Sequence, residues 1–191
     1  MRMIYRVYFH KMMLLFCLFA ITGCNKIDVL KLKYAVKHNY GREFSFSWQK
    51  NQILPDSIIY DCDIIERPLT IVSKVSKTLC SECLINYLVA ADYYISTFPS
   101  DSICFVAIVT KDNKIDELQS LLPDSILHNV QVVQDVEDNY LKKQTIKSVE
   151  GMWNVFLLDH NHKIVLMGDP LTHESVKTLY DKTVTDILIK E

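Results

Sequence analysis

The sequence is poor in residues that break regular structure, with four glycines and five prolines among 191 residues. Hydrophobic residues make up 49% of the chain, which is enough to bury a sizeable core. This composition is that of one ordinary globular domain. It excludes a disordered or low-complexity protein.

The chain also lacks a long apolar run at its N-terminus. The uncharged apolar stretch over residues 12–21 is only about ten residues long, whereas a helix needs about 20 to cross a hydrocarbon layer of about 30 Å. Three basic residues precede this stretch and none is acidic. We therefore expect a cleaved signal peptide rather than a permanent transmembrane anchor.

The end of this leader carries a more specific signal. Residues 21–24, Ile-Thr-Gly-Cys, resemble the lipobox of bacterial lipoproteins, which implies cleavage after residue 23 and acylation of Cys24, for example with palmitate. Two or three acyl chains anchor a protein stably to a membrane. Because Asn25 rather than Asp follows, the resemblance favours the outer membrane of a cell envelope, facing the periplasm. Ordinary secretion, with Cys24 left as a plain thiol, is the alternative.

The chain also has no excess of positive charge. Without the leader, 18 Lys and Arg residues stand against 23 Asp and Glu, a formal net charge of −5. A mildly acidic chain argues against a nucleic-acid partner. The expected membrane contact is the lipid on Cys24.

A pair of thiols stands where a strand pattern gives way to a helix pattern. Cys80 and Cys83 enclose two residues after the apolar, β-branched run 69–75. With Cys80 at the loop end and Cys83 in the first helical turn, the sulfurs approach within bonding distance, and the helix N-terminus stabilises a thiolate on Cys80. We expect Cys80 to be exposed and Cys83 to be sheltered. Two unrelated structural thiols, or half of a zinc site, are the other interpretations.

The other two cysteines of the mature domain, Cys62 and Cys104, lie in apolar strand-like runs. Isolated cysteines in such runs are usually buried small hydrophobes. In an oxidising compartment, two structural disulfides among the four thiols are the alternative.

Apolar periodicity predicts a regular order of elements after residue 68. The expected strands are 69–75, 103–110, 130–133, 155–158 and 163–167, with short edge strands at 44–48 and 57–60. The expected helices are 83–98, 115–122, 136–145 and 174–189. Helical crossovers imply parallel strands, and a hairpin at 159–162 adds antiparallel ones, so we predict a mixed central sheet with helices on both faces.

This order, with Cys-x-x-Cys at the start of the first core helix and the hairpin segment 155–170 near the end, resembles the thioredoxin-like fold. The likeness is to membrane-anchored thiol-disulfide oxidoreductase-like proteins of the cell envelope. It implies an α/β three-layer sandwich over residues 46–191, linked to the lipid by a tether over residues 24–45. The function it implies is thiol-disulfide exchange on envelope proteins.

The resemblance also assigns roles within the dithiol. Cys80 would be the attacking thiol and Cys83 the resolving one, with protein or peptide thiols and disulfides as partners. Lys77 would favour a thiolate on Cys80, and Glu82 would oppose it. We expect neither a cofactor nor a metal, because the two thiols carry the chemistry.

Two positions depart from the family pattern. Where the family has a carboxylate or amide in the strand before the motif, this chain has Ser73 and Lys74, so proton transfer to Cys83 would need water or another group. Where the family has a cis-proline facing the dithiol, this chain has Trp153. We expect Met152 and Trp153 to form the substrate-binding side, joined by a trans peptide bond.

The main alternative is a redox-inactive thioredoxin-fold lipoprotein that binds a partner and keeps a structural Cys80–Cys83 disulfide. A peroxiredoxin would have a different pattern, with Thr three residues before the cysteine, where this chain has Lys77. A zinc site needs four ligands, and His160 and His162 are the only paired histidines. Copper delivery would require wider cysteine spacing.

Overall fold

The computed structural model describes residues 34–45, 67–76, 78–110, 129–135, 146 and 154–189. The chain forms two compact units, Met1–His38 and Asn39–Glu191. In the first unit, residues 34–38 are helical, and the Tyr34 ring stacks on the His38 ring with centroids 5.9 Å apart. The predicted signal peptide and Cys24 lie outside the described residues. No helix within the described ranges is long and apolar enough to cross a membrane.

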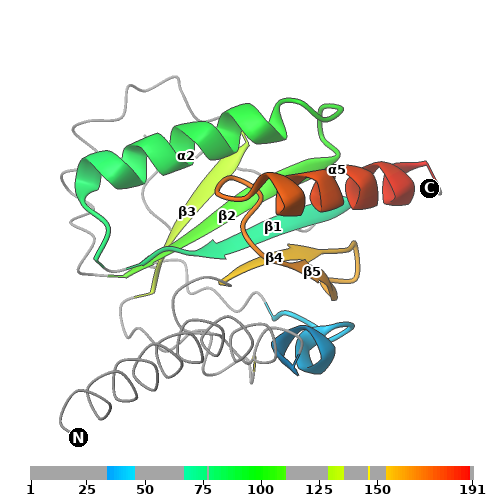
Figure 1. Ribbon diagram of the computed structural model, residues 1–191. Coiled ribbons are helices and arrows are strands. Elements are labelled where there is room, and N and C mark those ends of the chain that lie inside the picture. Colours follow the sequence, from blue (N-terminus) through cyan, green and yellow to red (C-terminus); the bar gives the residue numbers. More distant parts are fainter. Residues whose placement is uncertain are drawn as a thin grey trace, which may run out of the picture. The chain divides into compact units, whose positions relative to one another are not determined.

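The second unit is built on a five-stranded sheet with the strand order β3-β2-β1-β4-β5 (Figure 1). The strands are β1 (Leu69–Lys74), β2 (Ile103–Thr110), β3 (Val130–Asp135), β4 (Val155–Leu158) and β5 (Ile164–Met167). Strands β1, β2 and β3 are parallel, β4 is antiparallel to β1, and β5 is antiparallel to β4. The predicted mixed sheet is confirmed, and β3 is two residues longer than the predicted strand.

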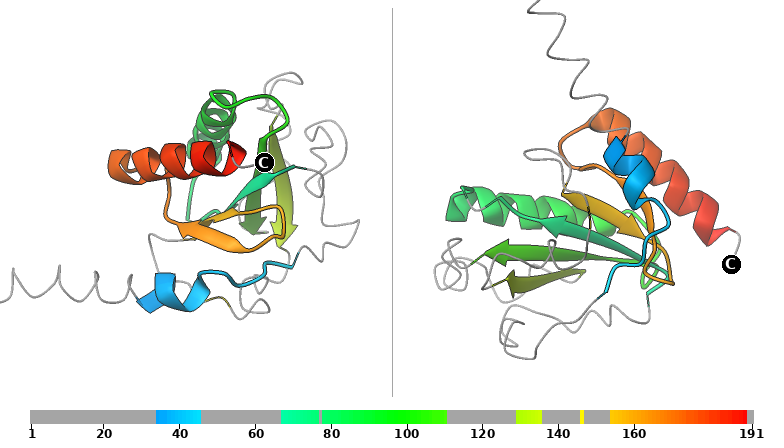
Figure 2. Two further views of the ribbon diagram at one scale, coloured as in Figure 1. Left: turned by 90° about the vertical axis from the view of Figure 1, so that its right-hand side faces the viewer. Right: turned by 90° about the horizontal axis from the view of Figure 1, so that it is seen from below.

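Two described helices cover one face of this sheet. Helix α2 (Ser81–Ile95) supplies the crossover that the parallel pair of β1 and β2 requires, and α5 (Glu174–Leu188) follows the last strand. They lie on the same side of the sheet (Figure 2). Their buried side chains are Leu84, Leu88, Ala91, Tyr94, Ile95, Tyr180 and Val184. These side chains form one core with residues of β1 to β4 such as Ile71 and Phe105.

The opposite face of the sheet is buried as well. Val72, Val106 and Phe156 have no exposed surface, and the Phe44 ring packs against the Phe156 ring with centroids 6.3 Å apart. Burial on both faces explains why these strands are almost continuously apolar. The predicted helices 115–122 and 136–145, the edge strand 57–60 and most of the edge strand 44–48 lie outside the described residues.

The predicted hairpin between β4 and β5 is present. The Asp159 carboxylate accepts hydrogen bonds from the backbone N–H groups of Asn161 and Lys163, both at 2.9 Å. A side chain that bonds its own turn in this way is a recognised cause of a tight reversal.

The free edge of β5 is paired with the segment 41–44. The Gly41 N–H donates to the Ile164 carbonyl at 2.8 Å, and the Ile164 N–H donates to the Arg42 carbonyl at 2.9 Å. The Phe44 N–H donates to the His162 carbonyl at 2.7 Å. The compact unit therefore includes residues 39–45, which the sequence analysis assigned to the tether.

Candidate active site

The two thiols lie together at the N-terminus of α2, just beyond the C-terminal end of β1. Cys80 is the N-cap residue, with extended backbone (φ −71°, ψ 158°), and its Sγ accepts a hydrogen bond from the Cys83 N–H at 3.2 Å. The two Sγ atoms are 2.7 Å apart, and both cysteines are free. Because sulfurs in a disulfide are about 2.05 Å apart, the bond can form with a small movement of either side chain.

The capping role of Cys80 also explains where the helix begins. The prediction placed the first helical residue at Cys83, whereas α2 starts at Ser81. The Cys80 sulfur takes the place of the Ser, Thr, Asp or Asn oxygen that usually accepts from the first turn. The Cys80 carbonyl already accepts the Leu84 N–H at 2.9 Å.

The pair is electrostatically asymmetric. The pKa of Cys80 is lowered, first by the hydrogen bond from the Cys83 thiol and then by the bond from the Cys83 N–H. The pKa of Cys83 is raised, chiefly because its thiol must keep its proton to donate to Cys80. The charge of Glu82 raises the pKa of Cys80, as predicted, and it also raises the pKa of Cys83. Lys77 lies outside the described residues.

One expectation about the pair is wrong. Cys83 was predicted to be sheltered in the helix, but both thiols are exposed. The first turn of α2 turns its sulfur toward Cys80 instead of toward the core, which Leu84 enters. The asymmetry between the thiols thus arises from the direction of their hydrogen bonds and not from burial.

The predicted substrate-binding residues, Met152 and Trp153, lie outside the described residues. The next residue, Asn154, accepts a hydrogen bond from the Lys74 N–H at its backbone carbonyl, at 2.8 Å. The chain directly after Trp153 therefore lies beside the end of β1 from which the dithiol loop departs.

A cluster of two hydroxyl groups and one carboxylate lies at the same end of the sheet. The Tyr87 hydroxyl, from the second turn of α2, lies 2.9 Å from the Ser73 hydroxyl on β1 and interacts electrostatically with the Asp169 carboxylate after β5. We call these three residues the Tyr87 contact. Burial, and then the charge of Asp169, raise the pKa of Tyr87, so its hydroxyl keeps its proton.

Asp169 is held in place for this contact by its own turn. Its carboxylate accepts the Leu171 N–H at 2.9 Å. Burial raises the pKa of Asp169, while the Leu171 N–H, the Tyr87 hydroxyl and the charge of His173 lower it. The sequence did not predict the Tyr87 contact. The only local signal was the four-residue spacing of Cys83 and Tyr87, which places them on one face of the helix.

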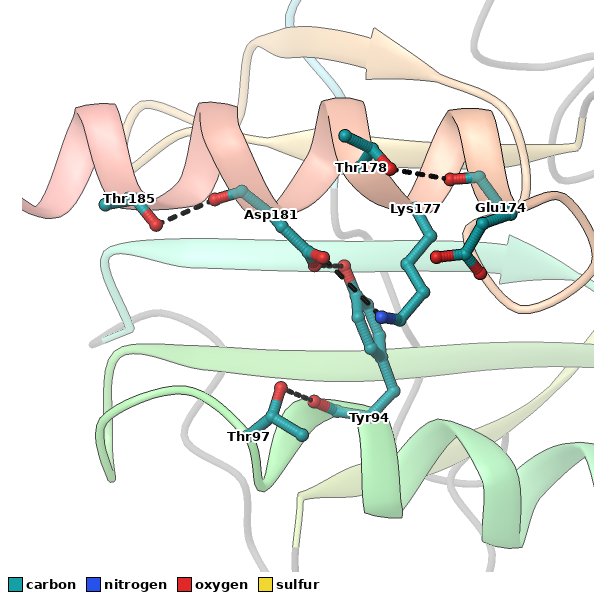
Figure 3. A network of polar contacts seen from close by, with 7 residues as sticks. All are labelled: Tyr94, Thr97, Glu174, Lys177, Thr178, Asp181 and Thr185. Atoms are coloured by element: carbon teal, nitrogen blue, oxygen red, sulfur yellow. Dashed lines mark hydrogen bonds and ion pairs between the residues drawn. The ribbon is translucent and has the colours of Figure 1, made fainter.

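The C-terminal end of α2 is held by a second tyrosine, Tyr94 (Figure 3). Tyr94 donates a hydrogen bond to the Asp181 carboxylate on α5 at 2.8 Å. Lys177 lies 3.6 Å from the other oxygen of Asp181 and 5.9 Å from the centroid of the Tyr94 ring. Burial, and then the bond to Asp181, raise the pKa of Tyr94.

Among the described residues, the other candidate groups are not gathered into a site. Cys104 is a buried thiol, with its sulfur 3.5 Å from the Thr70 hydroxyl, which confirms the prediction of a small buried hydrophobe. Cys62 lies outside the described residues. Within the described part of the chain, no group of three His, Cys, Asp or Glu side chains could hold a metal ion.

Comparison with protein-family models and with characterised protein sequences finds no match. Among solved structures, the chain is similar to a candidate thiol:disulfide interchange protein, DsbE, from Chlorobium tepidum. The TM-score is 0.51 at 13% identity, covering 78% of this chain and 97% of that one. The chain has the thioredoxin-like fold.

Two further thioredoxin-like structures match more weakly. One is a candidate thioredoxin from Neisseria meningitidis, with a TM-score of 0.44 at 15% identity, covering 69% of this chain and 83% of that one. The other is the thioredoxin domain of a thiol-disulfide oxidoreductase from Bacteroides vulgatus, with a TM-score of 0.38 at 16% identity, covering 70% and 99%. The fold assignment rests on the first structure, because these two TM-scores are below 0.5. In this thioredoxin-like domain, the exposed thiol pair lies at the N-terminus of the first core helix.

Proposed function

We propose that this protein is a membrane-anchored thioredoxin-like protein that carries out thiol-disulfide exchange on envelope proteins through Cys80 and Cys83. The observation that carries the proposal is the thiol pair itself. Two exposed, free sulfurs lie 2.7 Å apart, and their pKa values move in opposite directions. An accessible thiolate beside a second thiol is what exchange requires.

The reaction has two steps. The Cys80 thiolate attacks one sulfur of a partner disulfide, forms a mixed disulfide and releases the other partner sulfur as a thiolate. Cys83 then loses its proton and attacks the Cys80 sulfur, so that the second partner thiolate leaves and a Cys80–Cys83 disulfide remains. Two electrons pass to the partner, and the same steps in reverse oxidise a partner dithiol. The second attack is intramolecular because the two sulfurs are adjacent.

The decisive experiment is trapping combined with a reduction potential. Cys83→Ser should accumulate mixed disulfides through Cys80, because the second attack is lost, while the matched Cys80→Ser variant should not. The wild-type potential should lie above roughly −300 mV, since structural disulfides lie below that value. No trapped adduct together with a lower potential would favour the alternative, a redox-inactive partner-binding protein with a structural disulfide.

The anchor is a separate part of the proposal. The lipobox-like residues 21–24 support acylation of Cys24, and Asn25 supports placement at the outer membrane, facing the periplasm. Cys24→Ala should abolish acylation and release the protein from membranes. A lipid-free wild-type protein whose N-terminus is not Cys24 would contradict this proposal.

Met152 and Trp153 are proposed to form the partner-binding side of the site. The position of Asn154 beside the end of β1 supports this, since Trp153 directly precedes it. Trp153→Ala should change the rate of disulfide exchange with little loss of stability. A loss of about 3–5 kcal/mol with an unchanged exchange rate would instead make Trp153 a core residue.

A further inference from the structure

The reactive turn of α2 is followed at once by a side chain that points inward. Tyr87 lies four residues after Cys83, so the two share one face of the helix one turn apart. The thiol is exposed, whereas the Tyr87 hydroxyl reaches the buried Ser73 on β1 at 2.9 Å. The turn that carries Cys83 is therefore adjacent to the point at which α2 is bonded to the sheet.

Three segments that are distant in sequence meet at this hydroxyl. Ser73 lies near the end of β1, from which the dithiol loop departs, and Asp169 lies in the connection from β5 to α5. Asp169 is orientated by the Leu171 N–H, so the carboxylate whose charge acts on Tyr87 is fixed independently of α2. The Tyr87 contact thus ties α2 to β1 through the two hydroxyls, with the charge of a third segment acting on the same hydroxyl.

The nucleophile depends on the position of those turns. The Cys80 sulfur accepts the Cys83 N–H at 3.2 Å, which is a bond between the loop end and the first helical turn. A small rotation of that turn lengthens this bond and weakens the stabilisation of the thiolate. Tyr94 bonds α2 to α5 at the opposite end of the helix, where it cannot fix the first turn.

We propose that Tyr87 and Asp169 are positioning residues that hold the first turns of α2 so that the Cys83 N–H and thiol stabilise the thiolate of Cys80. This inference rests on the proposed function, because it assigns the control of the nucleophile used there. The groups that face Asp169 are Tyr87 from α2, Tyr180 from α5 and His173 at the start of α5.

The test is the pH dependence of Cys80 alkylation by iodoacetamide in the reduced protein. Tyr87→Phe should slow alkylation about two- to tenfold near neutral pH, which corresponds to the free energy of the one ordinary hydrogen bond that positions the turn. Tyr94→Phe is the matched control. It removes a phenol hydroxyl from the same helix, and it should leave the alkylation rate unchanged even if stability falls.

Two further variants keep the test decisive. Asp169→Asn should slow Cys80 alkylation in the same direction as Tyr87→Phe. If Tyr87→Phe does not fold, Ser73→Ala removes one side of the contact with a smaller change and should also slow it. Equal rates in wild type, Tyr87→Phe and Asp169→Asn, or equal slowing by Tyr94→Phe, would overturn the inference. Alkylation does not require exchange, so failed trapping in Cys83→Ser would count against the proposed function alone.

Discussion

The two ends of α2 are fastened in similar ways but present different chemistry. At each end a tyrosine hydroxyl bonds the helix to another segment, Tyr87 to Ser73 on β1 and Tyr94 to Asp181 on α5, and the charge of Asp169 also acts on Tyr87. The N-terminal end also exposes two thiols, whereas at the C-terminal end Tyr94 donates to Asp181, which forms an ion pair with Lys177 within α5. A helix fixed at both ends can present a reactive pair without moving when that pair is oxidised or reduced.

This difference predicts which substitutions in α2 should affect only stability and which should also affect the reactivity of the thiols. Changes at the C-terminal end should alter the free energy of unfolding and leave the thiols unaffected. Changes at the N-terminal end should alter the thiols as well. The following predictions test this separation, from the largest expected effect to the smallest.

The largest effect should be the difference between the two thiols themselves. Because the pKa of Cys80 is lowered and that of Cys83 is raised, more of Cys80 is thiolate near neutral pH, and Cys80 should react with iodoacetamide faster than Cys83. Mass spectrometry of briefly alkylated protein measures the ratio, and urea-unfolded protein is the control. Equal rates in the folded protein would contradict the asymmetry between the two thiols at the N-terminal end of the helix.

Residues in the middle of α2 should affect the stability of the fold and not the reactivity of the thiols. Leu88 is fully buried between the two ends, so Leu88→Ala should lower the free energy of unfolding by about 2–5 kcal/mol. The adjacent Val89 is 37% exposed, and Val89→Ala should cost much less. Urea unfolding measures both variants. A similar loss of stability for the two substitutions would contradict the placement of Leu88 on the buried face of the helix and Val89 on its exposed face.

The hydrogen bond at the C-terminal end of α2 should contribute less to stability than the burial of Leu88. Tyr94→Phe removes the hydrogen bond to Asp181, and it should lower stability by roughly 0.5–1.5 kcal/mol. The reduction potential of the dithiol should be unchanged. A shift in that potential would show that the two ends of α2 are coupled, and the separation drawn above would fail.

The smallest effect should be a pH dependence that originates at Asp169. Its pKa is raised above the ordinary 3.8, mainly by burial, so the folded protein holds this proton more tightly than the unfolded chain does. That contribution to stability is present below about pH 4 and is lost as the pH rises through the folded-state pKa. Wild type should therefore lose stability relative to Asp169→Asn over this interval in urea titrations. A relative gain would reverse the sign and contradict the burial of this carboxylate.

The strands and the site were predictable from the sequence to different extents. The strand over 103–110 matches β2, and the hairpin strand 155–158 matches β4, because apolar runs buried on both faces leave a strong local pattern. The start of α2 was placed two residues late, because a cysteine sulfur is not an expected cap. The exposure of Cys83 was wrong, because periodicity gives the face of a helix only approximately within its first turn.

The Tyr87 contact could not have been predicted. Its three residues come from β1, α2 and the segment after β5, and only the folded topology brings them together. Ser73 was noted as a departure from the family pattern, and Asp169 was noted only as part of the hairpin segment. What the structure adds is that Ser73 faces a tyrosine, and that a carboxylate from elsewhere in the chain reaches the same point.

The pairing of residues 41–44 with the edge of β5 has a mechanical consequence. Gly41 and Arg42 are bonded to Ile164 of β5, Phe44 is bonded to His162 just before it, and the Asn39 amide lies 3.4 Å from the Met167 sulfur. Any tension applied from the N-terminal side of the chain therefore enters the sheet at its outermost strand. Strand β1, which leads into the dithiol, lies two strands away in the sheet, on the other side of β4. Pulling should peel residues 41–44 from β5 first, while the reactive turn keeps its geometry. The same pairing covers an edge that would otherwise be open to another chain.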